Sequence, residues 1–343
     1  METIQIKNPL DMHLHLREKE ILRAVFPHTY QSFVAGLVMP NLSTPISNTN
    51  LALAYQEELQ KLCPNFKAFI ALYLTDALTQ DELIRAYQSG FKILKLYPKG
   101  ATTNSQNGVS EILNPQTLEI LQKAQELGMI LSIHAESNGY SLDREYEFLP
   151  IIKELAQTFP NLKIIIEHLS DHRSLELIEK YDNVFATLTL HHITLSLDDL
   201  LGKGLNPHLF CKPILKTPKD RDILLSLALK AHPKVSFGSD SAPHLESKKL
   251  NSSASAGIFS APNLLEQLCE LFESHHALDN LQSFVSDNAI RNYALSLESQ
   301  RIITLEKLPC PIPREIPIGK DKIIPLNAGK LCAWKIKAID EKC

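Results

Sequence analysis

The sequence lacks the features that mark a secreted, membrane-spanning or thiolate-zinc protein. Its six cysteines form no C-x-x-C pair, which argues against both a disulfide framework and a zinc site built from thiolates. No run approaches eighteen apolar residues, and the first residues are not a basic segment followed by an apolar one. We therefore expect a cytoplasmic protein.

Positive charge is also scarce. The 343 residues include 35 Lys and Arg against 39 Asp and Glu, a net charge of -4, and no cationic stripe is visible. Nucleic acids and anionic membranes attract clustered Lys and Arg, so we expect neither as a partner. Hydrophobic residues make up 44% of the chain, enough for a sizeable core, and one large domain is compatible with this length.

The chain instead shows a regular alternation of short apolar runs and segments with helical periodicity. The apolar runs predict eight strands, at 11–15, 33–39, 66–73, 91–97, 129–134, 163–168, 183–189 and 235–240. The helical segments between them include 50–61, 80–89, 115–127, 145–158, 174–181 and 220–231. Eight such units predict an α/β protein of the (β/α)8 TIM barrel class.

After Leu297 the pattern changes to a Pro-rich, strand-like tail that includes Pro309 to Pro313 and Lys322 to Trp334. Such a tail favours an extension over a second domain. We expect one domain over 1–343, with about 298–343 packed on the barrel.

The stretch from Asp11 to Arg17 has an unusual pattern for a strand. Because side chains alternate faces, Asp11, His13, His15 and Arg17 should share one side, with apolar residues on the other. A barrel strand can aim such polar groups into the barrel mouth. Two histidines two residues apart can share a metal ion, although a strand end with two hydrogen-bonded histidines fits this stretch equally well.

Polar residues also interrupt or end four later apolar runs. They are Lys95, His134, His168 and Asp240. Singly, such residues are more often satisfied core histidines or helix caps. Together with His13 and His15 they should converge at the carboxyl ends of the strands, where four histidines and an aspartate suit zinc in an open, catalytic arrangement.

Lys95 is the unexpected member of this group. An ammonium among apolar neighbours and metal cations would be both desolvated and repelled, so its amine should lose a proton easily. A neutral lysine amine can add carbon dioxide to form a carbamate, an anion with two oxygens that can bridge two metals. We therefore expect Lys95 to be carboxylated (N6-carboxylysine).

These motifs, taken together, resemble the amidohydrolase superfamily and, within it, the dihydroorotase family of the single-enzyme bacterial type. The resemblance spans the whole chain in the right order. It rests on the segments 11–17, Met39-Pro40-Asn41, 95–98 with 101–105, His134, His168, 207–216 and 238–244.

The resemblance implies a barrel with two zinc ions per chain, bridged by a carbon dioxide-derived carbamate on Lys95. It assigns His13, His15 and Asp240 to one metal and His134 and His168 to the other. It also implies substrate contacts, made by Arg17, Asn41 and His244 to a carboxylate, by Thr102 and Thr103 from a mobile loop, and by the backbone of Lys212 and Ala256 to the ring edge. The family often carries a cysteine-rich stretch between His244 and Phe259; this chain has Asn251 to Gly257 there, which puts the Ala256 assignment in doubt.

The implied reaction is the interconversion of (S)-dihydroorotate and N-carbamoyl-L-aspartate in pyrimidine (UMP) biosynthesis. A hydroxide shared by the metals would attack the ring carbonyl, with Asp240 as general base and acid. We expect a small-molecule substrate and a homodimer. Two alternatives are another cyclic-amide hydrolase such as a hydantoinase, which has no need for Arg17, Asn41 and His244 together, and a metal-free scaffold, which has no need for the ligand set.

Overall fold

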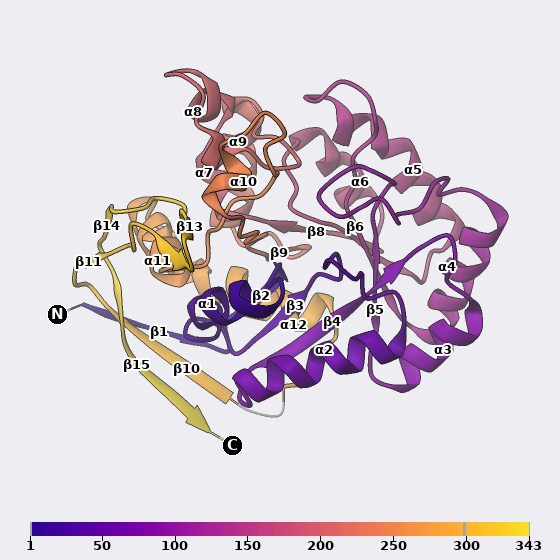
Figure 1. The fold of residues 1–343 in the computed structure, drawn as a ribbon, viewed down its shortest axis with the longest axis horizontal. Coiled ribbons are helices and arrows are strands. Elements are labelled where there is room, and N and C mark those ends of the chain that lie inside the picture. The colour runs from indigo at the N-terminus through magenta and orange to yellow at the C-terminus, as the bar shows by residue number, and fades with distance from the viewer. Residues whose placement is uncertain (1, 298–299, 343) are drawn as a thin grey trace.

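The central feature of the fold is a closed barrel of parallel strands. The computed structural model describes residues 2–297 and 300–342, and in that part of the chain eight parallel strands, β2 to β9, pair in sequence order with helices around them (Figure 1). The sheet closes on itself because the His15 amide donates to the Ser241 carbonyl at 3.0 Å and the Asp240 amide donates to the His13 carbonyl at 2.7 Å. The predicted TIM barrel is confirmed.

All eight predicted strands are present, with bounds within three residues of those expected. They are β2 (Leu10–Leu14), β3 (Ala35–Val38), β4 (Lys67–Leu74), β5 (Ile93–Leu96), β6 (Ile130–Ile133), β7 (Lys163–Ile166), β8 (Val184–Leu188) and β9 (Val235–Phe237). Seven of the eight end earlier than predicted, and polar residues at the ends of several apolar runs, such as His134, His168 and Asp240, lie outside the ladder. The side chains expected at the site therefore lie at, or just beyond, strand ends.

The six predicted helices are also present. They are α2 (Thr49–Leu62), α3 (Gln80–Gln88), α4 (Pro115–Leu127), α5 (Arg144–Thr158), α6 (Leu175–Lys180) and α9 (Pro218–Leu229). Asn48, Thr79, Asn114 and Thr217 each cap one of them by accepting a hydrogen bond from a first-turn amide. Helix α4 ends at Gly128, whose φ of +71° suits glycine.

The structure has further helices that are not among the six segments given above. These are α1 (Lys19–Tyr30), α11 (Leu264–Ser274) and the short α7 (Leu190–Thr194), α8 (Leu197–Leu201), α10 (Glu246–Lys249) and α12 (Asn288–Asn292). Short helical turns also occur at His172–Ser174, Pro207–Leu209, Leu278–Asn280 and Ser283–Asp287. No helix of the described residues is long and apolar enough to cross a membrane.

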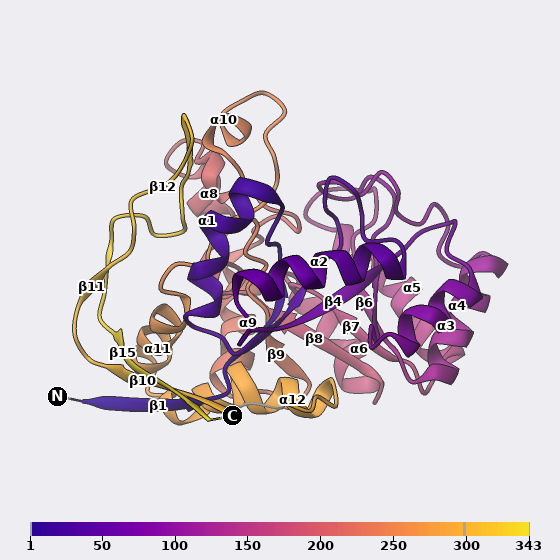
Figure 2. The same cartoon turned by 60° about the horizontal axis from the view of Figure 1, so that its bottom comes forward.

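The hydrophobic core has two main parts. One lies between the strands and the surrounding helices. The other fills the barrel near the strand starts, where residues such as Met12, Leu37, Ala71 and Ile130 pack with Tyr293, just after α12; Figure 2 shows α12 beneath the strands. Because apolar side chains plug this end, only the opposite end is available for polar groups.

The tail differs in detail from the prediction. Its main strands, β10 (Gln300–Glu306) and β15 (Lys335–Lys342), form an antiparallel sheet with β1 (Thr3–Lys7), an N-terminal strand that the sequence analysis missed (Figure 1). The predicted segments contain only the short strands β11 (Cys310–Pro311), β13 (Asp321–Ile323) and β14 (Leu331–Cys332), and β12 (Ile316–Ile318) lies between them. The tail packs closely on the rest of the chain, since β12 packs against α1 and Trp334 is fully buried.

Candidate active site

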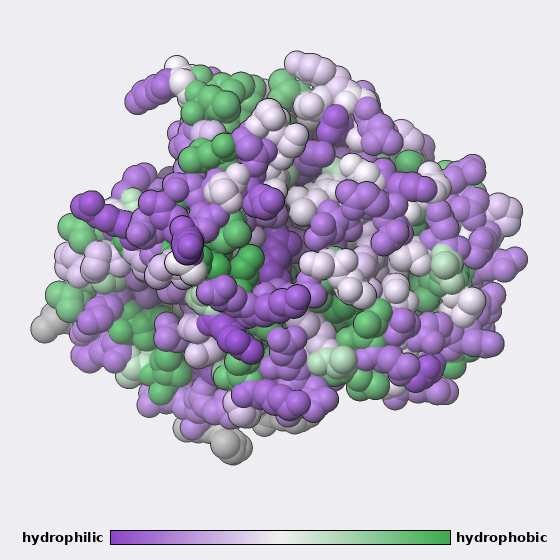
Figure 3. Space-filling view, viewed as in Figure 1, coloured by the Kyte–Doolittle hydropathy of each residue, from purple (hydrophilic) through white to green (hydrophobic). Residues whose placement is uncertain are grey.

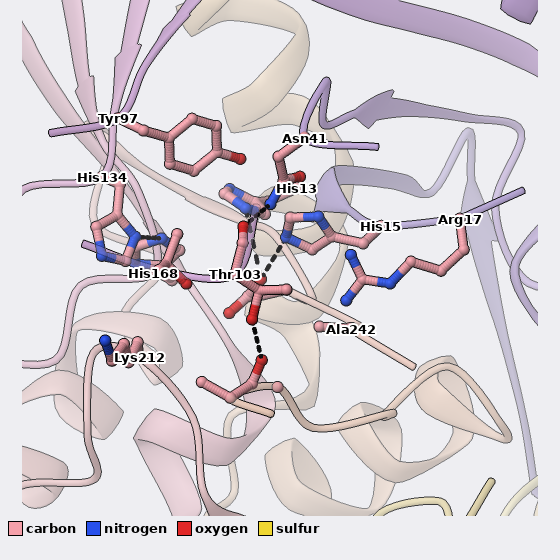
Figure 4. Close-up of a pocket in the computed structure, with 14 residues that line it drawn as sticks. His13, His15, Arg17, Asn41, Tyr97, Thr103, His134, His168, Lys212 and Ala242 are labelled. Atoms are coloured by element: carbon pink, nitrogen blue, oxygen red, sulfur yellow. Dashed lines mark hydrogen bonds and ion pairs between the residues drawn. The ribbon is translucent and has the colours of Figure 1, made fainter. Parts of the chain in front are cut away.

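One pocket at the carboxyl ends of the barrel strands collects most of the predicted site residues (Figure 4). It is lined by His13, His15, Arg17, Asn41, Thr102, Thr103, His134, His168, Lys212, Asp240 and Ala256. Hydrophilic residues surround a hollow near the middle of the face drawn in Figure 3. Two predicted residues do not line the pocket: Lys95, which is fully buried, and His244, which contacts Arg17.

The expected alternation along the first strand is wrong at Asp11. The pairing of β2 with β3 shifts register between Asp11 and Leu14, and Met12 joins the apolar cluster inside the barrel. Asp11 instead accepts hydrogen bonds from the amides of Ser239 (2.8 Å) and His13 (3.3 Å), and burial raises its pKa to about 7. A register shift of one residue moves side chains to the other face of a strand, so the Asp11 side chain lies outside the pocket. Its hydrogen bond from Ser239 links β2 to the segment that follows β9.

The first predicted ligand group is compact and buried. His13, His15 and Asp240 each offer a ligand atom, and these atoms lie within 4.8 Å of one another. The Asp240 Oδ1 atom is 3.0 Å from His15 Nε2 and 3.5 Å from His13 Nε2. Burial lowers the pKa of both histidines, and it raises the pKa of Asp240. Neutral imidazoles beside a carboxylate are the donor set that a divalent metal requires.

The second predicted ligand group lies across the pocket. His134 Nδ1 and His168 Nε2 are 3.0 Å apart, and Figure 4 shows both rings on the same side of the pocket. Burial, with neighbouring positive groups, holds the pKa of His168 well below its usual value, which keeps that imidazole neutral. The two nitrogens that face each other could bind a common ion.

Two glutamates that the sequence analysis missed fix the orientation of these rings. Glu167 Oε2 is 2.9 Å from His13 Nδ1, and Glu136 Oε2 is 2.8 Å from His134 Nε2. Each carboxylate therefore occupies one ring nitrogen and leaves the other for the pocket, an arrangement common around metal-binding histidines. Glu167 interrupts an apolar run just as Lys95 does, and that signal could have identified it.

Lys95 has the isolation that the sequence predicts. Its side chain is fully buried, its Nζ atom has no hydrogen-bond partner within the described ranges, and it lies 4.9 Å from the centre of the Tyr97 ring. Burial lowers the pKa of Lys95 to about 8, despite the nearby carboxylates of Glu167 and Asp240. The amine can therefore lose its proton at mildly alkaline pH, which carbamate formation requires.

Arg17 lies at the other side of the pocket, and Figure 4 shows its guanidinium directed toward the pocket. Its Nε atom donates to the Pro243 carbonyl at 3.1 Å, and its Nη2 atom is 3.1 Å from His244 Nε2. Burial and the charge of Arg17 keep the pKa of His244 well below its usual value. Arg17 thus carries the positive charge of this corner beside a neutral histidine, as a carboxylate site requires.

The loop that contains Thr102 and Thr103 lies over the pocket. The Asn41 side chain donates to the Thr103 carbonyl at 2.9 Å, and the Thr103 hydroxyl donates to the Ala256 carbonyl at 3.3 Å, the lower dashed line in Figure 4. Lys212 reaches the same loop, since its ammonium donates to the Ala101 carbonyl at 2.8 Å. The loop is therefore joined to both walls of the pocket and covers it, and its mobility stays a prediction.

Ala256 is in the pocket although the cysteine-rich stretch is absent. Its carbonyl lies 3.0 Å from His244 Nε2, and its neighbour Gly257 also lines the pocket. A Cβ atom at Gly257 would be 2.8 Å from the Ala242 carbonyl oxygen, so glycine is needed for this approach. Tyr97, Ala242 and Gly257 line the pocket but were not predicted as site residues.

Three site residues adopt an unusual backbone conformation. Arg17, His168 and Asp240 have φ values of +62°, +41° and +43°. Residues other than glycine rarely occupy this region, and such strain is concentrated at functional sites. It turns the chain sharply where each strand has just ended, so that the side chain enters the pocket.

Comparison with known proteins assigns the family. Residues 11–295 match the family model described as amidohydrolase. A dihydroorotase of Helicobacter hepaticus is 58% identical over 337 residues, which is 98% of each chain. The crystal structure of dihydroorotase from Campylobacter jejuni superposes with a TM-score of 0.92 at 38% identity and covers 98% of each chain. Dihydroorotase of Saccharomyces cerevisiae, solved in complex with 5-fluoroorotic acid, superposes with a TM-score of 0.93 at 35% identity. The match covers 98% of this chain and 99% of the yeast chain. This chain belongs to the amidohydrolases and, within them, to the dihydroorotase family.

Proposed function

We propose that this protein interconverts (S)-dihydroorotate and N-carbamoyl-L-aspartate, a step of pyrimidine biosynthesis. The observation that carries the proposal is one pocket that combines a histidine and aspartate ligand set with a half-buried arginine suited to a carboxylate. The full-length relatives named dihydroorotase support it, and the yeast relative was solved with a pyrimidine carboxylic acid.

We propose that the site holds two zinc ions. His13, His15 and Asp240 would hold one, His134 and His168 the other, and a carboxylated Lys95 would bridge them. The donor set fits, because these imidazoles are buried and because the Lys95 amine, without a partner among the described residues, would gain its missing contacts as a carbamate. Zinc ions bound there would act as Lewis acids that lower the pKa of water and polarise a ring carbonyl.

The residues of this chain would then bind the substrate and move a proton. Arg17, with Asn41 and His244, would bind the substrate carboxylate, since a planar guanidinium pairs with it in a bidentate manner. Asp240 would take a proton from the attacking water and deliver it to the departing ring nitrogen. Thr102 and Thr103 would close the loop over the ring and exclude bulk water.

The test is the ultraviolet absorbance of dihydroorotate, which falls when its ring opens. Purified protein supplied with zinc should consume dihydroorotate and leave hydantoin unchanged, and metal analysis should find two zinc ions per chain. Turnover of hydantoin with no turnover of dihydroorotate would assign the chain to the other cyclic-amide hydrolases. A protein that binds no metal and turns over neither compound would support the scaffold alternative.

A further inference from the structure

A buried lysine outside the predicted site joins two segments that line the pocket. Lys249, the last residue of α10, has 4% of its surface exposed. Its Nζ atom donates to the carbonyls of Phe210 at 2.7 Å, Ser255 at 3.1 Å and Gly257 at 2.7 Å. The three N–H groups of an ammonium can serve these three carbonyls at once.

No ion pair explains the charge of Lys249. In the described part of the chain no carboxylate oxygen lies within salt-bridge distance of it, and burial lowers the pKa of Lys249 to about 8. A charged group buried in this way is costly unless its donors are satisfied. Here three converging carbonyl dipoles satisfy them, so the ammonium acts as a clamp on the backbone.

The clamped backbone is the part of the pocket predicted to contact the substrate ring. Phe210 is two residues before Lys212, and Ser255 and Gly257 flank Ala256. The Gly257 amide donates to the Phe210 carbonyl at 2.9 Å, so the two segments also touch directly. The amides of Lys212 and Ala256 donate to no other described residue, which leaves both available to a ligand.

We infer that Lys249 is a positioning residue that holds the backbone of Lys212 and Ala256 at the spacing required by the edge of the substrate ring. The inference rests on the proposed function. It also explains how Ala256 keeps its place without the cysteine-rich stretch, because the clamp acts on backbone carbonyls and does not depend on the side chains between Asn251 and Ser255.

The test compares Lys249→Met with Lys248→Met, a neighbouring exposed lysine, in the zinc-loaded full-length protein. The Lys249 variant should raise KM for dihydroorotate at least tenfold and change kcat less than threefold, with normal zinc content. The control should match the wild type. In Lys249→Ala, propylammonium ions at tens of millimolar should lower KM again, whereas propanol should not, because the neutral alcohol lacks the three donors.

The outcomes separate this inference from the proposed function. A wild type that turns over dihydroorotate, with an unchanged KM in both Lys249 variants, would overturn the inference alone. A wild type without turnover would overturn both. Failure of both variants to fold, with or without the amine, would assign Lys249 to the stability of the fold and would also overturn the inference.

Discussion

Replacement of Lys95 by Met should stabilise the metal-free protein while abolishing its metal site. Burial lowers the pKa of Lys95 from 10.5 to about 8 even though Glu167 and Asp240 attract its charge. A pKa difference of this size corresponds to roughly 3 kcal/mol against the folded state while the lysine is protonated. Met has a similar length and needs no hydrogen bond, so most of this free energy should be recovered.

The stability gained by Lys95→Met should depend on pH, and the direction of this dependence follows from proton linkage. Below pH 8 the lysine is protonated in both the folded and the unfolded state, so the full penalty is present. Between pH 8 and 10.5 the folded state loses the proton first, and wild-type stability rises toward that of the variant. We expect Lys95→Met to add roughly 3 kcal/mol to the free energy of unfolding at pH 7 and about half of that at pH 9.5.

The assay is urea unfolding of wild type and variant at both pH values, with a chelator and in buffer free of carbon dioxide. Lys92→Met, at an exposed position just before the same strand, should change stability by less than about 0.5 kcal/mol. Zinc analysis of the loaded proteins should show depletion in the Lys95 variant alone. A Lys95→Met protein that is less stable than wild type at pH 7, or a gain that does not shrink at pH 9.5, would refute this reasoning.

Three further outcomes are expected. Arg17→Met should lower kcat/KM about 30- to 1,000-fold, which is on the order of 2 to 4 kcal/mol of transition-state binding, because it removes a charge-assisted contact to the substrate. Its zinc content should stay normal, and loss of zinc would make Arg17 structural. The double variant Thr102→Ala, Thr103→Ala should weaken both affinity and turnover, because the loop would close over the substrate less often. Orotate should slow proteolysis of this loop in the wild type. Unchanged kinetics in the double variant, with cleavage that does not depend on ligand, would count against a lid. The equilibrium should favour hydrolysis in alkaline buffer, because ring opening releases a carboxylate that is ionised above about pH 4 to 5. The end-point absorbance of dihydroorotate at mildly acidic and at alkaline pH measures this, and equal values would count against this substrate pair.

The sequence by itself determined the barrel and most residues of the pocket. Strand and helix periodicity is a local property, so eight alternations were readable without any contact information. Polar residues at the ends of apolar runs, such as His134 and His168, must meet because parallel strands end at one face of a barrel. Lys95 was identifiable because a charge within an apolar strand needs a special explanation.

Only the tertiary structure decided which groups partner these residues. The register shift in β2 depends on pairing with β3 and removes Asp11 from the pocket. The pairing of Glu167 with His13 joins positions 154 residues apart, and that of β1 with β10 joins the two ends of the chain. The clamp at Lys249 likewise depends on three backbone carbonyls, which no side-chain pattern records. Sequence patterns report local preference and motif identity, whereas these contacts exist only after loops of very different length have closed.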